Sequence, residues 1–203
     1  MIRQRVMVLG AVLLLGAPVA AKPPAAPSDD PDAGTELIGR PAPAWIFTRW
    51  VRGPERRLED FLGKVVLVRW WTDGCHFCRT TLPALEAMQE RHAKDSLVVL
   101  GVFHAKPEPR EVSDRRILEL AGRLGFSGPI AFDRDWRTLD RYWLGGNPER
   151  SWTSVSFLID REGVIRWVHG GGEYHPTEDP RHHRCAVQYR ELENVLAEVL
   201  AEP

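Results

Sequence analysis

Residues 64–85, KVVLVRWWTDGCHFCRTTLPAL, decide the fold of this 203-residue chain. The first part, KVVLVRWW, is β-branched and aromatic almost throughout, as expected of a strand buried on both faces of a sheet. Thr72-Asp73-Gly74 then breaks the run, and apolar residues recur at helical spacing (Leu82, Leu85 and Met88) up to about residue 92. The stretch therefore predicts a strand, a turn and a helix, with Cys75 and Cys78 where the helix begins.

The rest of the chain continues this alternation of strand and helix patterns. Arg161-Glu162-Gly163 separates two apolar runs as a hairpin turn does. We expect further strands at 96–104, 129–133, 156–160 and 164–169, and helices through 117–124 and 189–199. This order predicts an α/β fold in which helices flank a mixed central sheet.

The N-terminus predicts export. Arg3 and Arg5 precede a short apolar run, and Val19-Ala20-Ala21 suits cleavage by signal peptidase. We therefore expect a signal peptide at 1–21, a flexible Pro/Ala/Asp-rich tether at 22–34 and one domain at 35–203. The apolar run is shorter than a membrane span and no cysteine follows it to carry a lipid, so a periplasmic protein is favoured over an anchored one.

Composition narrows the classes of partner. The chain has 27 Lys and Arg against 28 Asp and Glu, with no block of like charge, so nucleic acid is not an expected partner. Three cysteines are too few for a disulfide-stapled scaffold, and two of them lie three residues apart. A reactive cysteine pair in a monomer is the expectation.

The spacing of Cys75 and Cys78 suits thiol–disulfide exchange. Cysteines at i and i+3 of a helix start share one face and can close a small disulfide ring. Unpaired amides and the helix dipole stabilise an anion at this end, which makes Cys75 the candidate nucleophile. Cys78, deeper along the helix, is the candidate resolving cysteine of this redox-active disulfide.

A zinc site is the main alternative use of a CxxC motif. It needs a second pair of ligands, for which His182-His183-Cys185 is the only candidate. A CxxC that follows a buried strand and opens a helix favours redox chemistry. We therefore assign no cofactor and no metal ligand.

Several motifs in order carry a family resemblance. Trp71 ahead of the CxxC, Pro83 in the following helix and the later FLIDREGVI (157–165) make the chain similar to TlpA/ResA-like periplasmic proteins of the thioredoxin-like superfamily, over about residues 37–200. The resemblance implies a thioredoxin fold with an N-terminal β-hairpin near 44–58 and a central insertion. It also implies a disulfide reductase that acts on protein disulfides or dithiols and is recharged by a membrane electron donor.

The chain departs from this family at the loop facing the cysteines. Ser154, after Thr153, stands where the family has a cis-proline, and the pair is a candidate substrate loop. A cis bond without proline costs about 2.5–4 kcal/mol, so we expect a trans peptide there. Gly74 replaces a common tryptophan, which predicts an open approach to Cys75. Thr81 replaces a glutamate of family members that act in cytochrome c maturation, which argues against that role.

Two residues are candidates for tuning the thiolate. By strand alternation Arg69 shares a face with Trp71, so its cation either lies under the CxxC or pairs with a carboxylate at the sheet's end. His76, between the cysteines, either stabilises the thiolate when protonated or is a solvated helix residue.

The C-terminal region holds a third cysteine among histidines. Cys185 keeps register with the apolar stripe of the last helix, which favours a buried core residue over a redox partner or a ligand beside His182 and His183. The glycine-rich segment between His169 and His175 could flank the active site, with Glu173 as a proton carrier.

Two further functions compete with the oxidoreductase. Thr72, three residues ahead of Cys75, matches peroxidatic sites of peroxiredoxin-like enzymes, but Val68 stands where those have proline. A copper chaperone would use Cys75 and Cys78 as soft ligands with one late histidine.

Overall fold

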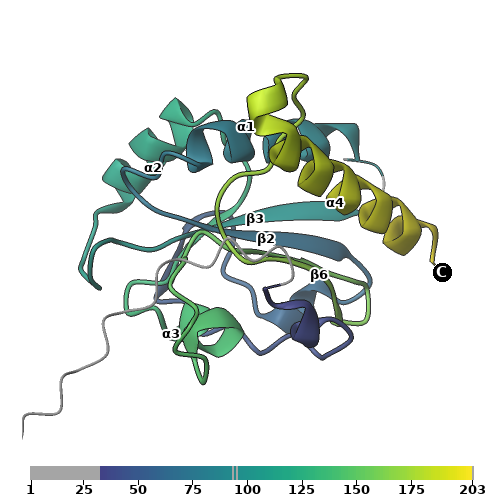
Figure 1. The fold of residues 1–203 in the computed structure, drawn as a ribbon. Helices are drawn as coiled ribbons and strands as arrows, with labels where there is room; N and C mark the ends of the chain where they lie inside the picture. The colour runs from purple at the N-terminus through teal and green to yellow at the C-terminus, as the bar shows by residue number, and fades with distance from the viewer. Residues whose placement is uncertain (1–32, 93, 95, 203) are drawn as a thin grey trace, which may run out of the picture.

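The computed structural model describes residues 33–92, 94 and 96–202, so the predicted signal peptide 1–21 and all but the end of the tether 22–34 lie outside the described residues. Six strands form one sheet in the order β1-β4-β3-β2-β5-β6, with helices on both faces (Figure 1). The strands are β1 (Arg49–Arg52), β2 (Val65–Trp71), β3 (Leu97–Phe103), β4 (Ile130–Phe132), β5 (Ser156–Ile159) and β6 (Ile165–His169). The helices are α1 (Cys78–Arg91), α2 (Asp114–Arg123), α3 (Arg137–Leu139) with its continuation η3 (Asp140–Leu144), and α4 (His183–Ala201); η1 (Thr35–Leu37), η2 (Leu58–Phe61) and η4 (Pro180–His182) are single turns.

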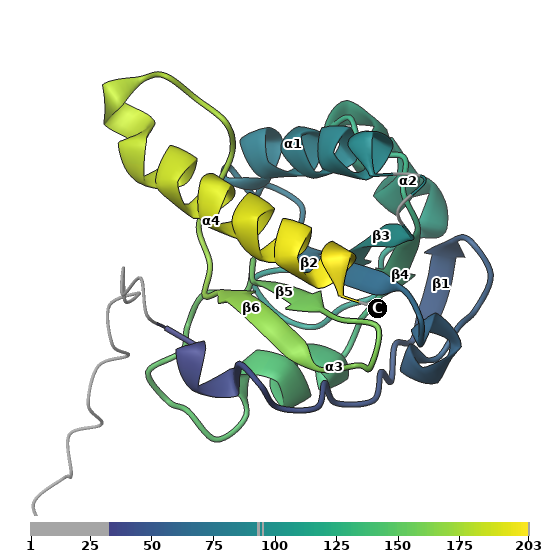
Figure 2. The same ribbon diagram turned by 90° about the vertical axis from the view of Figure 1, so that its right-hand side faces the viewer.

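The central strand β2 is buried along its whole length, as its composition predicts. It pairs in parallel with β3 and antiparallel with β5, so both of its edges are hydrogen-bonded. Val65, Leu67 and Trp71 face one core and Val66, Val68 and Trp70 the other. The first core lies under α1, α2 and α4, and the second lies over α3 (Figure 2).

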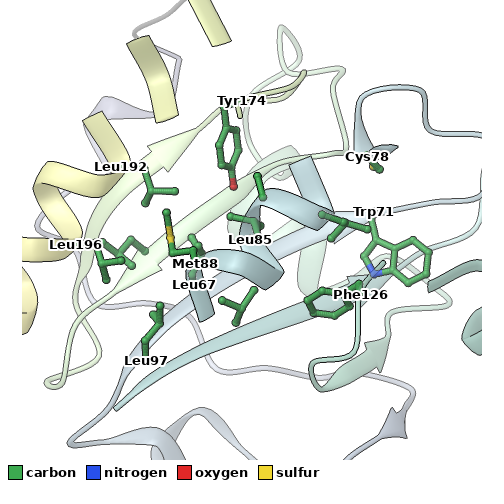
Figure 3. Packing of buried hydrophobic residues seen from close by; sticks show 14 of the residues in the cluster. Leu67, Trp71, Cys78, Leu85, Met88, Leu97, Phe126, Tyr174, Leu192 and Leu196 are labelled. Carbon is green, nitrogen blue, oxygen red and sulfur yellow. The ribbon is translucent and has the colours of Figure 1, made fainter. Parts of the chain in front are cut away.

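The packing of the first core fixes α1 over the sheet. Leu85 and Met88 of α1 lie between the strands and Leu192 and Leu196 of α4, and all four are at most 1% exposed (Figure 3). Each such side chain contributes about 1.5–3 kcal/mol by leaving water. The helix that begins at Cys78 is therefore held along its length by apolar contacts, and its first turn has a fixed place at the sheet edge.

Strand directions bring distant segments to that edge. Since β3 is parallel to β2, and β6 is antiparallel to β5, the strands β2, β3 and β6 all run the same way. Their carboxyl ends and the start of β5 thus share one edge of the sheet. The CxxC, His104, Ser154 and His169 all lie at this edge.

The mixed sheet flanked by helices confirms the predicted fold class, and the strands and helices expected from residue 64 onward are present. The predicted hairpin joins β5 to β6, with Gly163 at a φ of 82° in its turn. The connection from β3 to β5 contains α2, β4 and α3, where the resemblance places a central insertion. Among the described residues, no helix is long and apolar enough to cross a membrane.

The prediction of an N-terminal β-hairpin near 44–58 is wrong. This stretch forms one strand, β1, which is the outermost strand of the sheet and pairs antiparallel with β4. After Gly53 and Pro54 the chain continues with Glu55-Arg56-Arg57, which has no apolar side chains for a second arm to bury. The aromatic residues before β1 pack on the sheet instead, where the Trp45 Nε1 donates to the Tyr142 hydroxyl at 2.8 Å.

Two histidines at the sheet edge are buried. His104 follows β3 and His169 ends β6, and they are 0% and 4% exposed. Burial is the main cause that lowers the pKa of each to about 3, and nearby positive charges contribute to this shift, from Lys106 and Arg69 at His104 and from Arg69 and Arg184 at His169. Both side chains are therefore neutral in the folded protein at neutral pH.

This burial predicts a loss of stability in mild acid. The unfolded chain takes up protons on both histidines below pH 6.5, whereas the folded chain does not until about pH 3, so stability falls as the pH drops through this window. At pH 5 the loss is about 2 kcal/mol for each histidine. Urea unfolding at pH 7 and pH 5 measures it, and His169→Gln should remove about half of the difference. An unchanged difference in that variant would contradict the assignment.

Candidate active site

Cys75 and Cys78 form a disulfide between the end of β2 and the start of α1, with Cα atoms 5.4 Å apart. The turn before Cys75 needs a φ of 71° at Gly74, which a residue with a side chain rarely adopts. A Cβ at Gly74 would meet nothing within 4 Å, so this side of Cys75 is open to solvent. The pair thus lies where the sequence predicts it, at the helix start.

The two sulfurs differ in exposure. Cys75 is partly exposed, whereas Cys78 is fully buried in the core under α1. The amide of Cys78 donates to the Cys75 Sγ at 3.2 Å, so a backbone donor at the start of α1 points at this sulfur. In the reduced protein, a donor and a helix dipole at this position would favour a thiolate on Cys75. An incoming sulfur can reach Cys75 and cannot reach Cys78.

A hollow of about 610 Å³ opens beside Cys75, between α1 and α2. Its lining combines apolar side chains with two exposed arginines. It is lined by Thr72, Gly74, Cys75, Arg79, Pro83, Leu120, Arg123, Leu124 and Gly125.

The loop before β5 covers the other side of the disulfide. The Ser154 Oγ lies 3.4 Å from the Cys75 Sγ and 3.9 Å from the Cys78 Sγ. Within the described residues the one cis peptide is Lys106–Pro107, so Thr153–Ser154 is trans as predicted. The Thr153 hydroxyl faces away and lies 2.8 Å from the Nε2 of His104. Of the two loop residues, Ser154 alone presents its side chain to the sulfurs.

Arg69 is fully buried and braces this loop. Its Nη1 donates to the Ser154 carbonyl at 2.6 Å and its Nη2 to the Gly172 carbonyl at 2.8 Å. Its guanidinium also lies 5.5 Å from the centre of the Tyr174 ring. No carboxylate is among its contacts in the described chain, so pairing with a carboxylate is not the explanation of this arginine. The guanidinium does not contact the sulfurs directly. It contacts the backbone of Ser154, whose side chain lies beside them.

His76 is exposed, and its ring contacts Phe77 at a centroid distance of 6.0 Å. Phe77 in turn meets Trp152 edge-to-face at 5.4 Å. The predicted tuning role of His76 remains a prediction.

Sequence reasoning missed two residues of this site. Trp152 shields the CxxC turn through Phe77, and His104 supports the Ser154 loop through Thr153. One signal for His104 was available, because it directly follows a buried strand parallel to β2 and so had to lie at the same edge as the CxxC. Nothing in the local pattern around Trp152 points to Phe77.

The segment after β6 reaches α1 rather than the sulfurs. Glu173 accepts a hydrogen bond from the Thr80 hydroxyl at 2.8 Å, and the Tyr174 amide donates to the Thr81 hydroxyl at 3.3 Å. Cys185 is a free, buried thiol, as predicted, and burial raises its pKa. Its Sγ lies 3.8 Å from the Nδ1 of His182.

Fold and site define the class: a thioredoxin-fold protein with an accessible disulfide at the start of its first helix. The model of the AhpC/TSA family matches residues 38–168, and the chain belongs to this family.

Relatives of known name agree with this class. The thiol-disulfide oxidoreductase ResA of Geobacillus kaustophilus is 28% identical over 131 residues, which are 64% of this chain and 68% of ResA. Protein DipZ of Mycobacterium bovis is 30% identical over 136 residues, but the match covers 65% of this chain and only 19% of DipZ. A crystal structure titled a putative thiol:disulfide interchange protein DsbE, from Chlorobium tepidum, superposes with a TM-score of 0.61 at 22% identity and covers 81% of this chain and 98% of its own.

The chain is accordingly a thiol:disulfide oxidoreductase. The two competing functions are not favoured. The Thr72 hydroxyl, which would face a peroxidatic sulfur, donates to the Asp73 carboxylate at 3.1 Å. The CxxC sulfurs that a copper chaperone would use are joined to each other.

The contact of Ser154 with the sulfurs predicts a measurable effect on Cys75. Ser154→Ala should raise the pKa of the Cys75 thiol, since a hydrogen bond to a charged group contributes about 1.5 kcal/mol or more. Alkylation of the reduced protein by iodoacetamide near neutral pH should slow by about tenfold. Thr153→Val is the matched control because that hydroxyl faces His104, and equal rates in the two variants would contradict a role for Ser154.

Proposed function

We propose that this chain reduces disulfides of exported proteins outside the cytoplasm, with Cys75 as the attacking thiolate and Cys78 as the resolving thiol. The difference in exposure between the two sulfurs carries the proposal. A client must meet Cys75 first, at the open side next to Gly74.

The exchange proceeds in two balanced steps. The Cys75 thiolate attacks one sulfur of the client disulfide, which forms a mixed disulfide and releases the other client sulfur as a thiolate that takes up a proton. Cys78 then loses its proton and attacks the Cys75 Sγ. The second client sulfur leaves as a thiolate and takes up the proton that Cys78 lost. The client therefore leaves with two thiols, and its two electrons come from the Cys75 and Cys78 dithiol, which is oxidised to the disulfide.

The proposal also covers where the protein acts and what reduces its disulfide. The pattern of residues 1–21 supports export, and a dithiol donor at the membrane would return the disulfide to the reduced state. Cell fractionation tests the first point, and the N-terminal sequence of the exported protein should then begin at Lys22 if Ala21 ends the signal.

Trapping tests the roles of the two cysteines. Cys78→Ser should accumulate a mixed disulfide with a client such as insulin, because the resolving sulfur is missing, while Cys75→Ser should form none. Non-reducing gel electrophoresis and mass spectrometry detect the adduct. His183→Ala changes an exposed residue outside the site, keeps both cysteines and should reduce insulin at the wild-type rate. An adduct on Cys78 in the Cys75→Ser variant would reverse the assignment.

Arg69 is proposed to stabilise the thiolate through its cation and the Ser154 loop. Loss of that stabilisation makes the reduced form less favourable, so Arg69→Gln should lower the reduction potential of the Cys75–Cys78 pair, by about 30 mV for a tenfold change in the equilibrium constant. Arg69→Lys keeps the charge and should retain part of the effect. Equilibration with glutathione measures both.

The potential of the wild-type pair also tests the direction of electron flow. A value near about −270 mV supports a reductase, and one near about −120 mV would instead indicate an oxidase.

A further inference from the structure

Four metal-binding side chains converge behind α1, outside the CxxC. Glu173 and His175 come from the segment after β6, His182 ends η4, and Cys185 lies in the first turn of α4. One ligand atom from each lies within 4.8 Å of all the others. Cys185 is buried, and the side chains of Glu173 and His175 are only 14% and 13% exposed. The His182 side chain is 39% exposed, so the group is enclosed except on the side of His182.

The distances suit a tetrahedral ion. Zinc binds sulfur at about 2.3 Å and nitrogen or oxygen at about 2.0–2.2 Å, so the edges of its ligand tetrahedron are roughly 3.3–3.8 Å. The Glu173 Oε1 lies 3.2 Å from the His182 Nδ1, and the Cys185 Sγ lies 3.8 Å from that same nitrogen. The other carboxylate oxygen, Glu173 Oε2, lies 3.8 Å from the His175 Nε2, and one ligand atom from each of the four residues lies within 4.8 Å of the others. Small side-chain adjustments would close the remaining edges.

His175 gives an independent sign of a ligand. Its Nδ1 lies 3.2 Å from the Pro176 carbonyl, which fixes the proton on that nitrogen and leaves a lone pair on Nε2. The Nε2 is buried, faces Glu173 and has no hydrogen-bond partner among the described residues. A histidine held by a backbone carbonyl with its other nitrogen free is the usual arrangement of a metal ligand. The Thr80 hydroxyl orients Glu173 in the same way.

Ion pairing alone does not account for the cluster. A pair between Glu173 and a protonated His182 would explain those two side chains. It leaves the His175 Nε2 without a hydrogen bond in the described part of the chain, and it does not involve the Cys185 thiol. A cation at the centre satisfies all four groups at once.

We propose that Glu173, His175, His182 and Cys185 bind one zinc ion. One thiolate, two imidazoles and one carboxylate are all zinc ligands, and four protein ligands are typical of a structural site. Cys185 gives up its thiol proton to solvent when the ion binds. The site differs from the zinc alternative considered from the sequence, because the CxxC is not part of it and the exposed His183 is replaced by Glu173 and His175.

Titration of the untagged protein with Zn²⁺ tests the proposal. The Cys75–Cys78 disulfide is kept oxidised so that these sulfurs cannot bind metal. Isothermal titration calorimetry should show one equivalent bound, and His182→Ala and Cys185→Ser should each weaken binding by at least about tenfold, since even indirect contacts to a metal contribute that much. Co²⁺ in place of Zn²⁺ should give a sulfur-to-cobalt charge-transfer band that Cys185→Ser abolishes.

His183→Ala is the matched control, because this neighbouring histidine is exposed and outside the cluster. It should bind Zn²⁺ as the wild type does. Circular dichroism checks that each variant is folded, and His182→Ala decides the matter if the buried Cys185 does not tolerate serine. The proposal fails if the oxidised wild type binds no stoichiometric Zn²⁺, or if His182→Ala binds as tightly as His183→Ala.

Discussion

The buried guanidinium of Arg69 holds the site together. A cation removed from water needs strong acceptors, and here the carbonyls of Ser154 and Gly172 supply them from two different loops. The planar fork of an arginine can reach both at once, which a lysine cannot do. Since β2 is fixed by a strand on each edge, Arg69 is fixed too. The loop before β5 and the segment after β6 thereby take their positions from the central strand, as the CxxC does.

Much of this fold could be predicted because its signals are local. A run of seven buried residues in β2, the glycine turn before β6 and the apolar stripe of α4 each identify an element without knowledge of its partners. The pairing of β1 could not be predicted in the same way. A four-residue strand at a sheet edge carries no pattern that specifies its neighbour, and here β4, far along the chain, offered the free edge that a hairpin arm would have filled.

The candidate site likewise has parts that the sequence predicts and parts that it does not. Cys75 and Cys78 are three residues apart in sequence, and their context predicts their chemistry. The meeting of Glu173 and His175 with His182 and Cys185 depends on how the chain returns from β6 to α4, which residue spacing does not reveal. The sequence pattern places His182 and His183 in one candidate ligand group. The helical turn at the start of α4 separates them, because neighbouring residues there point in different directions.

The serine at the facing loop changes how the disulfide is presented. A proline at this position would place an apolar ring and no side-chain donor against the sulfurs, whereas the Ser154 hydroxyl lies near both of them. That side of the pair is closed by a polar group belonging to the protein itself. The opposite side is bordered by Gly74 and opens onto the hollow between α1 and α2. Because Cys78 is buried beneath, Cys75 is the sulfur of the pair that a second molecule can reach, and the hollow beside it provides a surface next to that sulfur.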